Sequence, residues 1–213
     1  MSSTFADRLV VHDHPLLHHK LARLRDPRTG SPEFRALLKQ VAALMTFEAT
    51  RGWPTREVSV ETPLETTVGR VLDGPVTVVP VLRAGLAMAE GVLSVMPEAR
   101  VGHLGMARDE ETLLPTTYLR RLPADLGAGP VLAVDPMLAT GGSAAATVAA
   151  LRAAGAQDLR FLCLVAAPEG VERLLSSDPL VRVHVAVLDR ELNAHGYILP
   201  GLGDAGDRAF GTL

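Results

Sequence analysis

Lysine, cysteine and aromatic residues are scarce in this chain of 213 residues. Lys20 and Lys39 are its only lysines, the formal net charge is −3, and no basic block or interleaved aromatic patch occurs. A protein that binds nucleic acid mainly through its phosphates presents a positive face. The composition therefore argues against nucleic acid as the main partner.

A single cysteine excludes a disulfide within the chain. Cys163 lies in the apolar run 159–167, which favours a buried, unreactive thiol over a nucleophile. The first residues lack the apolar core of a signal peptide, and no apolar run is long enough to span a bilayer. We therefore expect a cytoplasmic protein with no membrane partner.

From residue 74 onward, strand-like and helix-like patterns alternate. Strands are expected at 76–82, 99–106, 130–135, 159–167 and 181–188, and helices at 85–96, 143–154 and 169–176. Alternation at this density predicts a mostly parallel sheet with helices on both faces. Because the length suits one hydrophobic core, we expect a single α/β domain.

The first 73 residues are organised differently. Residues 5–15 suggest a short strand or extended arm, and Ser31 with Pro32 predicts the start of a helix, Ser31 as its cap, that ends before Gly52. Apolar and polar residues alternate within 57–72 on either side of a proline, which predicts an antiparallel hairpin projecting from the domain. Such an arm often contacts a second subunit.

Four histidines gather near the N-terminus, namely His12, His14, His18 and His19. Imidazoles at this spacing can share a metal ion. No cysteine or glutamate recurs beside them at ligand spacing, and a residue before proline is usually extended. A metal role for these histidines therefore stays open.

The most informative stretch leads from an apolar run at 131–134 to Ser143 and the alanines after it. The apolar run predicts a buried strand, and the alanines predict the first turns of a helix. N–H groups at a helix start bind anions, helped by the helix dipole. Gly141 and Gly142 allow close approach, and Thr140 can add a hydroxyl donor. The stretch predicts a phosphate site, although a plain turn would also use two glycines.

Charged residues lie at the carboxyl ends of three predicted strands or shortly after them. Asp135 would repel a phosphate but could accept hydrogen bonds from the hydroxyls of a sugar beside it. Arg83 could bind a second phosphate group through two N–H groups of its guanidinium, or could end its strand in solvent. Arg108 opens the polar run 108–112, which suits a mobile flap over the site or a solvated hairpin tip. These residues suggest a sugar phosphate with a second anionic group.

The stretch 193–208 contains too many glycines for a helix or a strand. A loop folded over a small planar ligand, which it reads through main-chain groups, would need this composition. Tyr197, Ile198 and Leu202 argue against a disordered tail because apolar residues usually pack.

Two long motifs and several short ones occur in a recognisable order. The long motifs are Asp135-Pro136-Met137-Leu138-Ala139-Thr140-Gly141-Gly142-Ser143 and Gly196-Tyr197-Ile198-Leu199-Pro200-Gly201-Leu202-Gly203-Asp204-Ala205-Gly206-Asp207. The short ones include His14-Pro15-Leu16, Leu24-Arg25-Asp26, Glu61-Thr62-Pro63, Leu82-Arg83-Ala84-Gly85-Leu86 and Arg108-Asp109-Glu110. Together they resemble the uracil phosphoribosyltransferase family over nearly the whole chain.

The resemblance implies the type I phosphoribosyltransferase fold, an α/β fold with a mostly parallel sheet flanked by helices, a C-terminal hood and a projecting β-arm. N-terminal helices and the arm would occupy about 1–73, the core about 74–189 and the uracil-binding hood about 190–213. Members condense uracil with 5-phosphoribosyl-1-diphosphate (PRPP) in pyrimidine salvage, giving uridine monophosphate (UMP) and diphosphate. They use Mg²⁺ and form homodimers or higher oligomers, and some respond to GTP, which the sequence leaves open here.

The resemblance also implies roles for individual residues. Catalytic roles fall on Arg83, Arg108 and Asp135. PRPP would be bound by Arg83, Arg108, Asp135, Pro136, Met137, Leu138, Ala139, Thr140, Gly141, Gly142, Ser143 and Asp204. Uracil would be bound by Tyr197, Ile198, Gly203, Asp204 and Ala205, and Asp204 would also hold the metal indirectly.

Two positions depart from common patterns. Pro136 stands where most type I relatives carry a second acid, a departure that the uracil enzymes share. Ala194 stands where the commoner pattern of the family has an acid between Asn193 and His195. This departure puts in doubt only a contact that does not touch the ligand directly. Two rivals stay open: a related transferase for another base, and a regulator on this fold that binds nucleotides and RNA without turnover.

Overall fold

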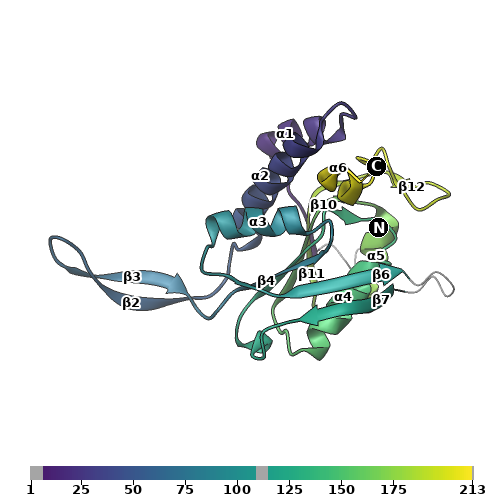
Figure 1. The fold of residues 1–213 in the computed structure, drawn as a ribbon. Coiled ribbons are helices and arrows are strands. Elements are labelled where there is room, and N and C mark those ends of the chain that lie inside the picture. The colour runs from purple at the N-terminus through teal and green to yellow at the C-terminus, as the bar shows by residue number, and fades with distance from the viewer. Residues whose placement is uncertain (1–6, 109–114, 213) are drawn as a thin grey trace.

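A computed structural model describes residues 7–108 and 115–212, with the backbone alone for 107–108 and 115–117. Its centre is a sheet whose strands follow the order β1-β11-β10-β8-β4-β6-β7 (Figure 1). These strands are β1 (Leu9–Val11), β4 (Thr77–Leu82), β6 (His103–Arg108), β7 (Pro115–Arg121), β8 (Val131–Val134), β10 (Leu159–Ala166) and β11 (Arg182–Leu188). Two short strands, β5 (Arg100–Val101) and β9 (Met137–Leu138), pair in parallel with β4 and β10. Within the described residues, only β7 runs antiparallel to its neighbour in this sheet.

Helices cover both faces of this sheet, as the alternating pattern predicts. The helices are α1 (Pro15–Arg25), α2 (Ser31–Ala49), α3 (Leu86–Val95), α4 (Gly142–Ala153), α5 (Pro168–Ser177) and α6 (Ala205–Phe210), with a short 3₁₀ turn at Leu126–Ala128. Successive residues of a strand point to opposite faces, so Leu132 packs with the α1, α2 and α3 side while Ala133 packs with the α4 and α5 side. The sheet is therefore buried on both faces.

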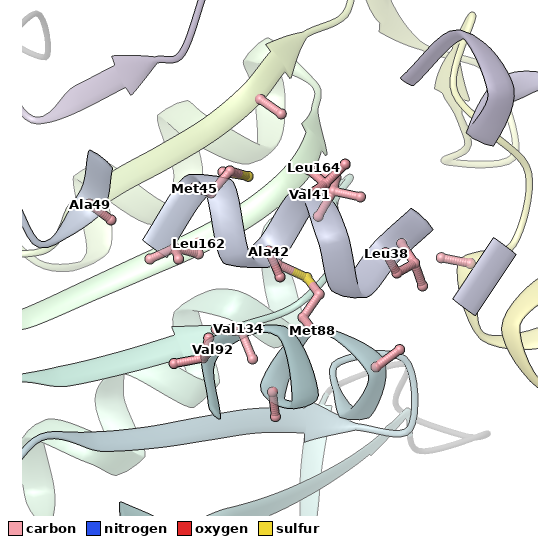
Figure 2. Close-up of a cluster of buried hydrophobic side chains, with 14 of the residues drawn as sticks. Leu38, Val41, Ala42, Met45, Ala49, Met88, Val92, Val134, Leu162 and Leu164 are labelled. Atoms are coloured by element: carbon pink, nitrogen blue, oxygen red, sulfur yellow. The ribbon is translucent and has the colours of Figure 1, made fainter. Parts of the chain in front are cut away.

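Figure 2 shows the core on the first of these faces. Met45 of α2 and Met88 of α3 lie there with Val134 of β8 and Leu162 of β10, and all four side chains are fully buried. This packing fixes the end of β8, and therefore the backbone of the residue that follows it.

The predicted arm is an antiparallel hairpin of β2 (Thr55–Glu61) and β3 (Thr66–Leu72). It projects away from the body of the molecule (Figure 1). Leu64 at its tip is 95% exposed, and Val68 on β3 is 65% exposed. Leu72 at the base of the arm packs against the core, but Leu64 and Val68 farther out are exposed. Exposed large apolar side chains on a projecting arm mark a surface for a partner.

The N-terminal region confirms one expectation and corrects another. The expected short strand within residues 5–15 is β1, and α1 begins at Pro15, in the first-turn position that suits proline. His14 itself is extended and caps the helix, since its Nδ1 accepts a hydrogen bond of 3.1 Å from the N–H of Leu16. Gly30, and not Ser31, stands at the cap position of α2, where no side chain accepts a hydrogen bond.

The four histidines do not converge. His18 contacts Asp13 at 2.7 Å, and His12 stacks on His184 of β11 with ring centroids 5.2 Å apart. Among the described residues, no group of three or more His, Cys, Asp or Glu side chains could hold a metal ion. No described helix is long and apolar enough to cross a membrane.

The buried histidine pair predicts sensitivity to acid. Burial lowers the pKa of His184 to about 3, with His12, Arg160 and Arg182 adding repulsion, and burial also lowers the pKa of His12, against a smaller opposing effect of Glu48. The unfolded chain takes up protons below about pH 6.5, whereas the folded protein keeps His184 neutral down to about pH 3. Stability should therefore fall by about 1.4 kcal/mol per pH unit for this histidine as pH drops from 6 towards 3.

Thermal unfolding of His184→Gln across that pH range checks this prediction. The variant should show a shallower fall in Tm with acid than the parent protein, whatever its absolute stability. Equal slopes would mean that other groups control acid unfolding.

Candidate active site

The predicted phosphate cradle lies at the N-terminus of α4, just beyond β8 and β9. Gly141 caps this helix in a left-handed conformation with φ of 76°. A Cβ atom on Gly141 would come within 2.6 Å of the carbonyl oxygen of Gly170 in α5. Both the backbone angle and the close contact require glycine here. The first N–H groups of α4 are therefore free of helical partners and positioned to bind an anion.

A cavity of about 390 Å³ opens in front of this cradle. It is lined by Ala84, Asp135, Met137, Leu138, Ala139, Thr140, Gly141, Gly142, Ser143, Ala144, His195, Gly196, Tyr197, Ile198, Gly203, Asp204, Ala205 and Gly206. The carboxyl end of β8, the start of α4 and the C-terminal hood thus share one cavity. This is the edge at which parallel α/β sheets bind ligands.

Asp135 lines this cavity directly after β8. Burial raises the pKa of its carboxyl to about 7, the N–H of Met137 opposes the rise, and the carboxylate of Asp204 adds to it. The N–H of Met137 lies 3.4 Å from Oδ1 of Asp135. Two acids therefore face one cavity, and a cation or the hydroxyl groups of a ligand would relieve their repulsion.

The hood contains a short hairpin of β12 (Glu191–Leu192) and β13 (Ile198–Leu199), followed by a turn and α6. Asp204 caps α6 by accepting a 2.9 Å hydrogen bond from the N–H of Asp207. Ile198 and Ala205 are buried, whereas Tyr197 is 53% exposed and lies at the rim. The prediction that this glycine-rich stretch contains no helix or strand is wrong. Gly206 lies within α6, where it packs beside Ala84.

Two predicted residues lie outside the lining of the cavity. Pro136 is buried, and its carbonyl accepts hydrogen bonds from Leu164 and Val165, which ties the cradle to β10. Arg83 follows β4 and is exposed, with one guanidinium nitrogen 3.6 Å from a carboxyl oxygen of Asp207. This ion pair brings Arg83 to the edge of the hood.

Arg108 ends β6 at the same edge of the sheet, but its side chain lies outside the described residues. The predicted flap, residues 108–112, lies outside the described residues except for the backbone of Arg108. β6 and β7 form an antiparallel pair on either side of this segment.

Sequence reasoning missed five residues that line the cavity, namely Ala84, Ala144, His195, Gly196 and Gly206. His195 and Gly196 lie within the glycine-rich stretch 193–208, and this position could have identified them as residues of the cavity. Ala84 follows Arg83 directly, and Ala144 begins the alanine run. Asp207 was missed as the partner of Arg83, because an ion pair between residues so distant in sequence leaves no local pattern.

Two carboxylates in the cavity could bind a metal ion. Asp135 and Asp204 offer hard oxygen ligands in one cavity, a donor type that suits Mg²⁺. Since Mg²⁺ usually binds through one or two carboxylates together with substrate phosphates, the two acids beside the cradle fit this ion.

Comparison with known proteins gives consistent results. The family model described as uracil phosphoribosyltransferase matches residues 10–212. Uracil phosphoribosyltransferase of Dictyoglomus thermophilum is 54% identical over 205 residues, covering 96% of this chain and 99% of that protein. A uracil phosphoribosyltransferase of Anoxybacillus flavithermus is 50% identical over 206 residues, with the same coverage.

Solved structures agree on the fold. The AQ2163 protein of Aquifex aeolicus superposes with a TM-score of 0.90 and 37% identity, covering 95% of this chain and 97% of that one. A hypoxanthine-guanine phosphoribosyltransferase from Bacillus anthracis, only 12% identical, shares the fold with a TM-score of 0.52 over 75% of this chain and 80% of that one. The predicted type I phosphoribosyltransferase fold is confirmed. With its motifs, its cavity and these matches in agreement, the chain belongs to the uracil phosphoribosyltransferase family.

Proposed function

We propose that this chain joins uracil to PRPP in a pyrimidine salvage reaction. A bond forms between N1 of uracil and C1 of the ribose, the bond from C1 to the diphosphate oxygen breaks, and the proton of N1 passes to the solvent. The products are UMP and diphosphate. The observation that supports this best is the single cavity shared by a helix N-terminus, Asp135 and the backbone of the hood.

The phosphoribosyl half of the site is assigned to β8 and the start of α4. Residues 139–143 bind the 5′-phosphate through N–H groups, helped by the hydroxyls of Thr140 and Ser143. Asp135 accepts hydrogen bonds from the ribose hydroxyls, and the N–H of Met137 donates to the same carboxyl. Pro136 and Leu138 support this loop through their main-chain bonds to β10 and to Ala167.

The uracil half is assigned to the hood. Ile198, Gly203 and Ala205 read the base, largely through the main chain, with Asp204 alongside and Tyr197 at the rim. Uracil presents acceptor, donor and acceptor along one edge, whereas cytosine places a donor at the last position. Leaving buried polar groups unpaired is costly, so such a site discriminates steeply between the two bases.

Asp204 would hold Mg²⁺ indirectly, through a water or the substrate, with Asp135 in the same cavity. When bound, this ion neutralises charge on the phosphoryl oxygens. The residues of the chain position the reactants and stabilise the diphosphate as its charge develops, since Arg83 and Arg108 both lie at the carboxyl ends of strands. The ribose then passes through an oxocarbenium-like state, and no residue is assigned as a general base.

Replacing Arg83 by alanine tests the diphosphate assignment. One charge-assisted contact to a developing anion is lost, so turnover should fall at least about tenfold. Steady-state kinetics with saturating uracil and PRPP measures this. Arg190→Ala is a matched control, since Arg190 is also exposed and forms an exposed ion pair, with Glu191. Kinetics of Arg83→Ala equal to those of the control would refute the role.

The activity itself is tested by incubating the protein with Mg²⁺, PRPP and each nucleobase in turn. New nucleotide should appear with uracil. Product with a different base would favour the related transferase, and no product with uracil would contradict the proposal. A nucleotide-binding regulator of RNA would bind RNA without turnover, which the acidic chain disfavours.

We also propose that residues 1–213 act as one domain and that two copies associate through the arm of β2 and β3. The exposed Leu64, Val60 and Val68 support an apolar contact there. The mass in solution of Leu64→Asp compared with the parent, each with and without GTP, tests this association and any effect of GTP on it.

A further inference from the structure

The motif Leu24-Arg25-Asp26 has no part in the reaction assigned above, yet it ends α1 beside the hood. The guanidinium of Arg25 binds both carboxyl oxygens of Asp189, at 2.7 and 2.9 Å. Asp189 follows β11, and its side chain is only 4% exposed, while that of Arg25 is 24% exposed. A bidentate pair in such a buried position fixes orientation as well as distance.

This pair also holds one residue of the hood turn. Nη1 of Arg25 donates to the carbonyl oxygen of Gly201 at 2.7 Å, and the N–H of Gly201 donates to Oδ2 of Asp189 at 2.9 Å. Both main-chain polar groups of Gly201 are therefore bound by a single ion pair. Gly201 itself is buried and adopts a left-handed φ of 62°.

A second arginine holds the next residue. Arg208 of α6 donates to the carbonyl oxygen of Leu202 at 2.7 Å and to that of Asp26 at 2.7 Å, and it also binds the carbonyl of Leu24. Its guanidinium lies over the ring of Phe34, 4.4 Å from the ring centre. The turn at Gly201 and Leu202 is thus tied to the C-terminal end of α1 from two sides.

The turn at Gly201 and Leu202 lies between two residues that line the cavity, so the contacts that hold the turn also affect the cavity. Ile198 lies before it and Gly203 after it, and both line the cavity, whereas residues 199–202 lie outside the lining. Main-chain groups that read a base must be held close to their productive geometry. We infer that Arg25 and Asp189 are positioning residues, which set the hood backbone that recognises the base without touching the base themselves. The inference rests on the proposed function for its kinetic consequence.

Arg25→Met tests this inference, because methionine fills similar space but cannot bind Asp189 or Gly201. The KM for uracil should rise at least about tenfold and by a larger factor than the KM for PRPP, because the hood alone reads uracil, whereas PRPP is held mainly by the cradle at α4 and only in part by Asp204 of the hood. In Arg25→Lys the KM for uracil should rise less than in Arg25→Met but stay above that of the parent, because lysine restores the charge without the forked donors of arginine. Arg23→Met is the matched control, on the same helix with an exposed ion pair to Glu33.

A purely structural role predicts a different pattern. If Arg25→Met remains folded and its uracil KM equals that of Arg23→Met, or if the KM values for uracil and PRPP rise by the same factor, the inference is overturned. Should Arg25→Met fail to fold, Arg25→Lys and Asp189→Asn carry the test with the same criterion, since both preserve shape and some hydrogen bonding.

Amide hydrogen exchange separates this inference from the proposed function. Exchange at residues 198–205 should be faster in Arg25→Met than in Arg23→Met, with residues 139–143 unchanged. This result is expected even if the parent protein makes no nucleotide from uracil, which would refute the proposed function alone. Equal exchange in the two variants would refute the positioning role.

Discussion

Asp135→Asn is expected to lower turnover about 100- to 1,000-fold, because a preorganised charge beside the reacting ribose is lost. Asparagine keeps the shape and one acceptor oxygen but not the negative charge that stabilises a cationic transition state. Steady-state kinetics with saturating substrates measures the effect. Turnover within about threefold of the parent would remove Asp135 from the catalytic machinery.

The same residue predicts a pH profile. Because burial raises the pKa of Asp135 to about 7, the free protein carries a proton there below this pH. Binding of PRPP requires the ionised form, so kcat/KM for PRPP should rise as pH increases through about 7 and then level off. Asp135→Asn should lack this rise.

Stability should change in the opposite sense. A carboxyl whose folded pKa is raised destabilises the folded protein once pH passes the ordinary value near 3.8, and the full effect is present above pH 7. Asp135→Asn should therefore have a higher Tm than the parent at pH 8 and a smaller advantage at pH 5. A lower Tm at pH 8 would indicate that the carboxylate is stabilised in the folded protein.

Gly141→Ala is the second change with a large expected effect. A left-handed φ costs about 1 to 2 kcal/mol for a residue with a side chain, and the new Cβ would lie 2.6 Å from the carbonyl oxygen of Gly170. The start of α4 must then shift. A displacement of about 1 Å in a binding loop can cost about 100-fold, so the KM for PRPP should rise by about that factor.

Gly52→Ala separates strain from function. Gly52 adopts a similar φ of 81°, but nothing lies within 4 Å of a Cβ placed there. Both variants should lose stability from backbone strain, whereas only Gly141→Ala should bind PRPP more weakly. Equal kinetic parameters in the two variants would contradict the cradle assignment.

The repeating elements of the core were predictable from sequence because each has a local pattern. Apolar runs identified β8 and β10, and the alternation identified β2 and β3 to within a few residues. No local pattern predicted the bounds of α1, since its apolar positions are interspersed with histidine and arginine and its cap is a histidine. The predicted strand at 99–106 is in fact two, β5 and β6, separated at Gly102.

The site was predictable as far as its backbone motifs extend. The cradle and the glycine-rich hood each follow from the conformational demands on a few residues, and the cavity brings them together. The ion pairs that hold the hood in place could not be predicted from the sequence. Arg25 with Asp189, and Arg83 with Asp207, are each separated by more than a hundred residues, so only the folded chain reveals them.

The pairing of Arg83 with Asp207 has a consequence for the catalytic cycle. In the proposed reaction, diphosphate and Asp207 are alternative anionic partners of one guanidinium, so diphosphate that binds the nitrogen facing Asp207 competes with that carboxylate. The pair is exposed and 3.6 Å apart, and such pairs contribute only about 0 to 1 kcal/mol. Asp207 therefore keeps Arg83 near the cavity between turnovers while offering little competition to a doubly charged incoming group.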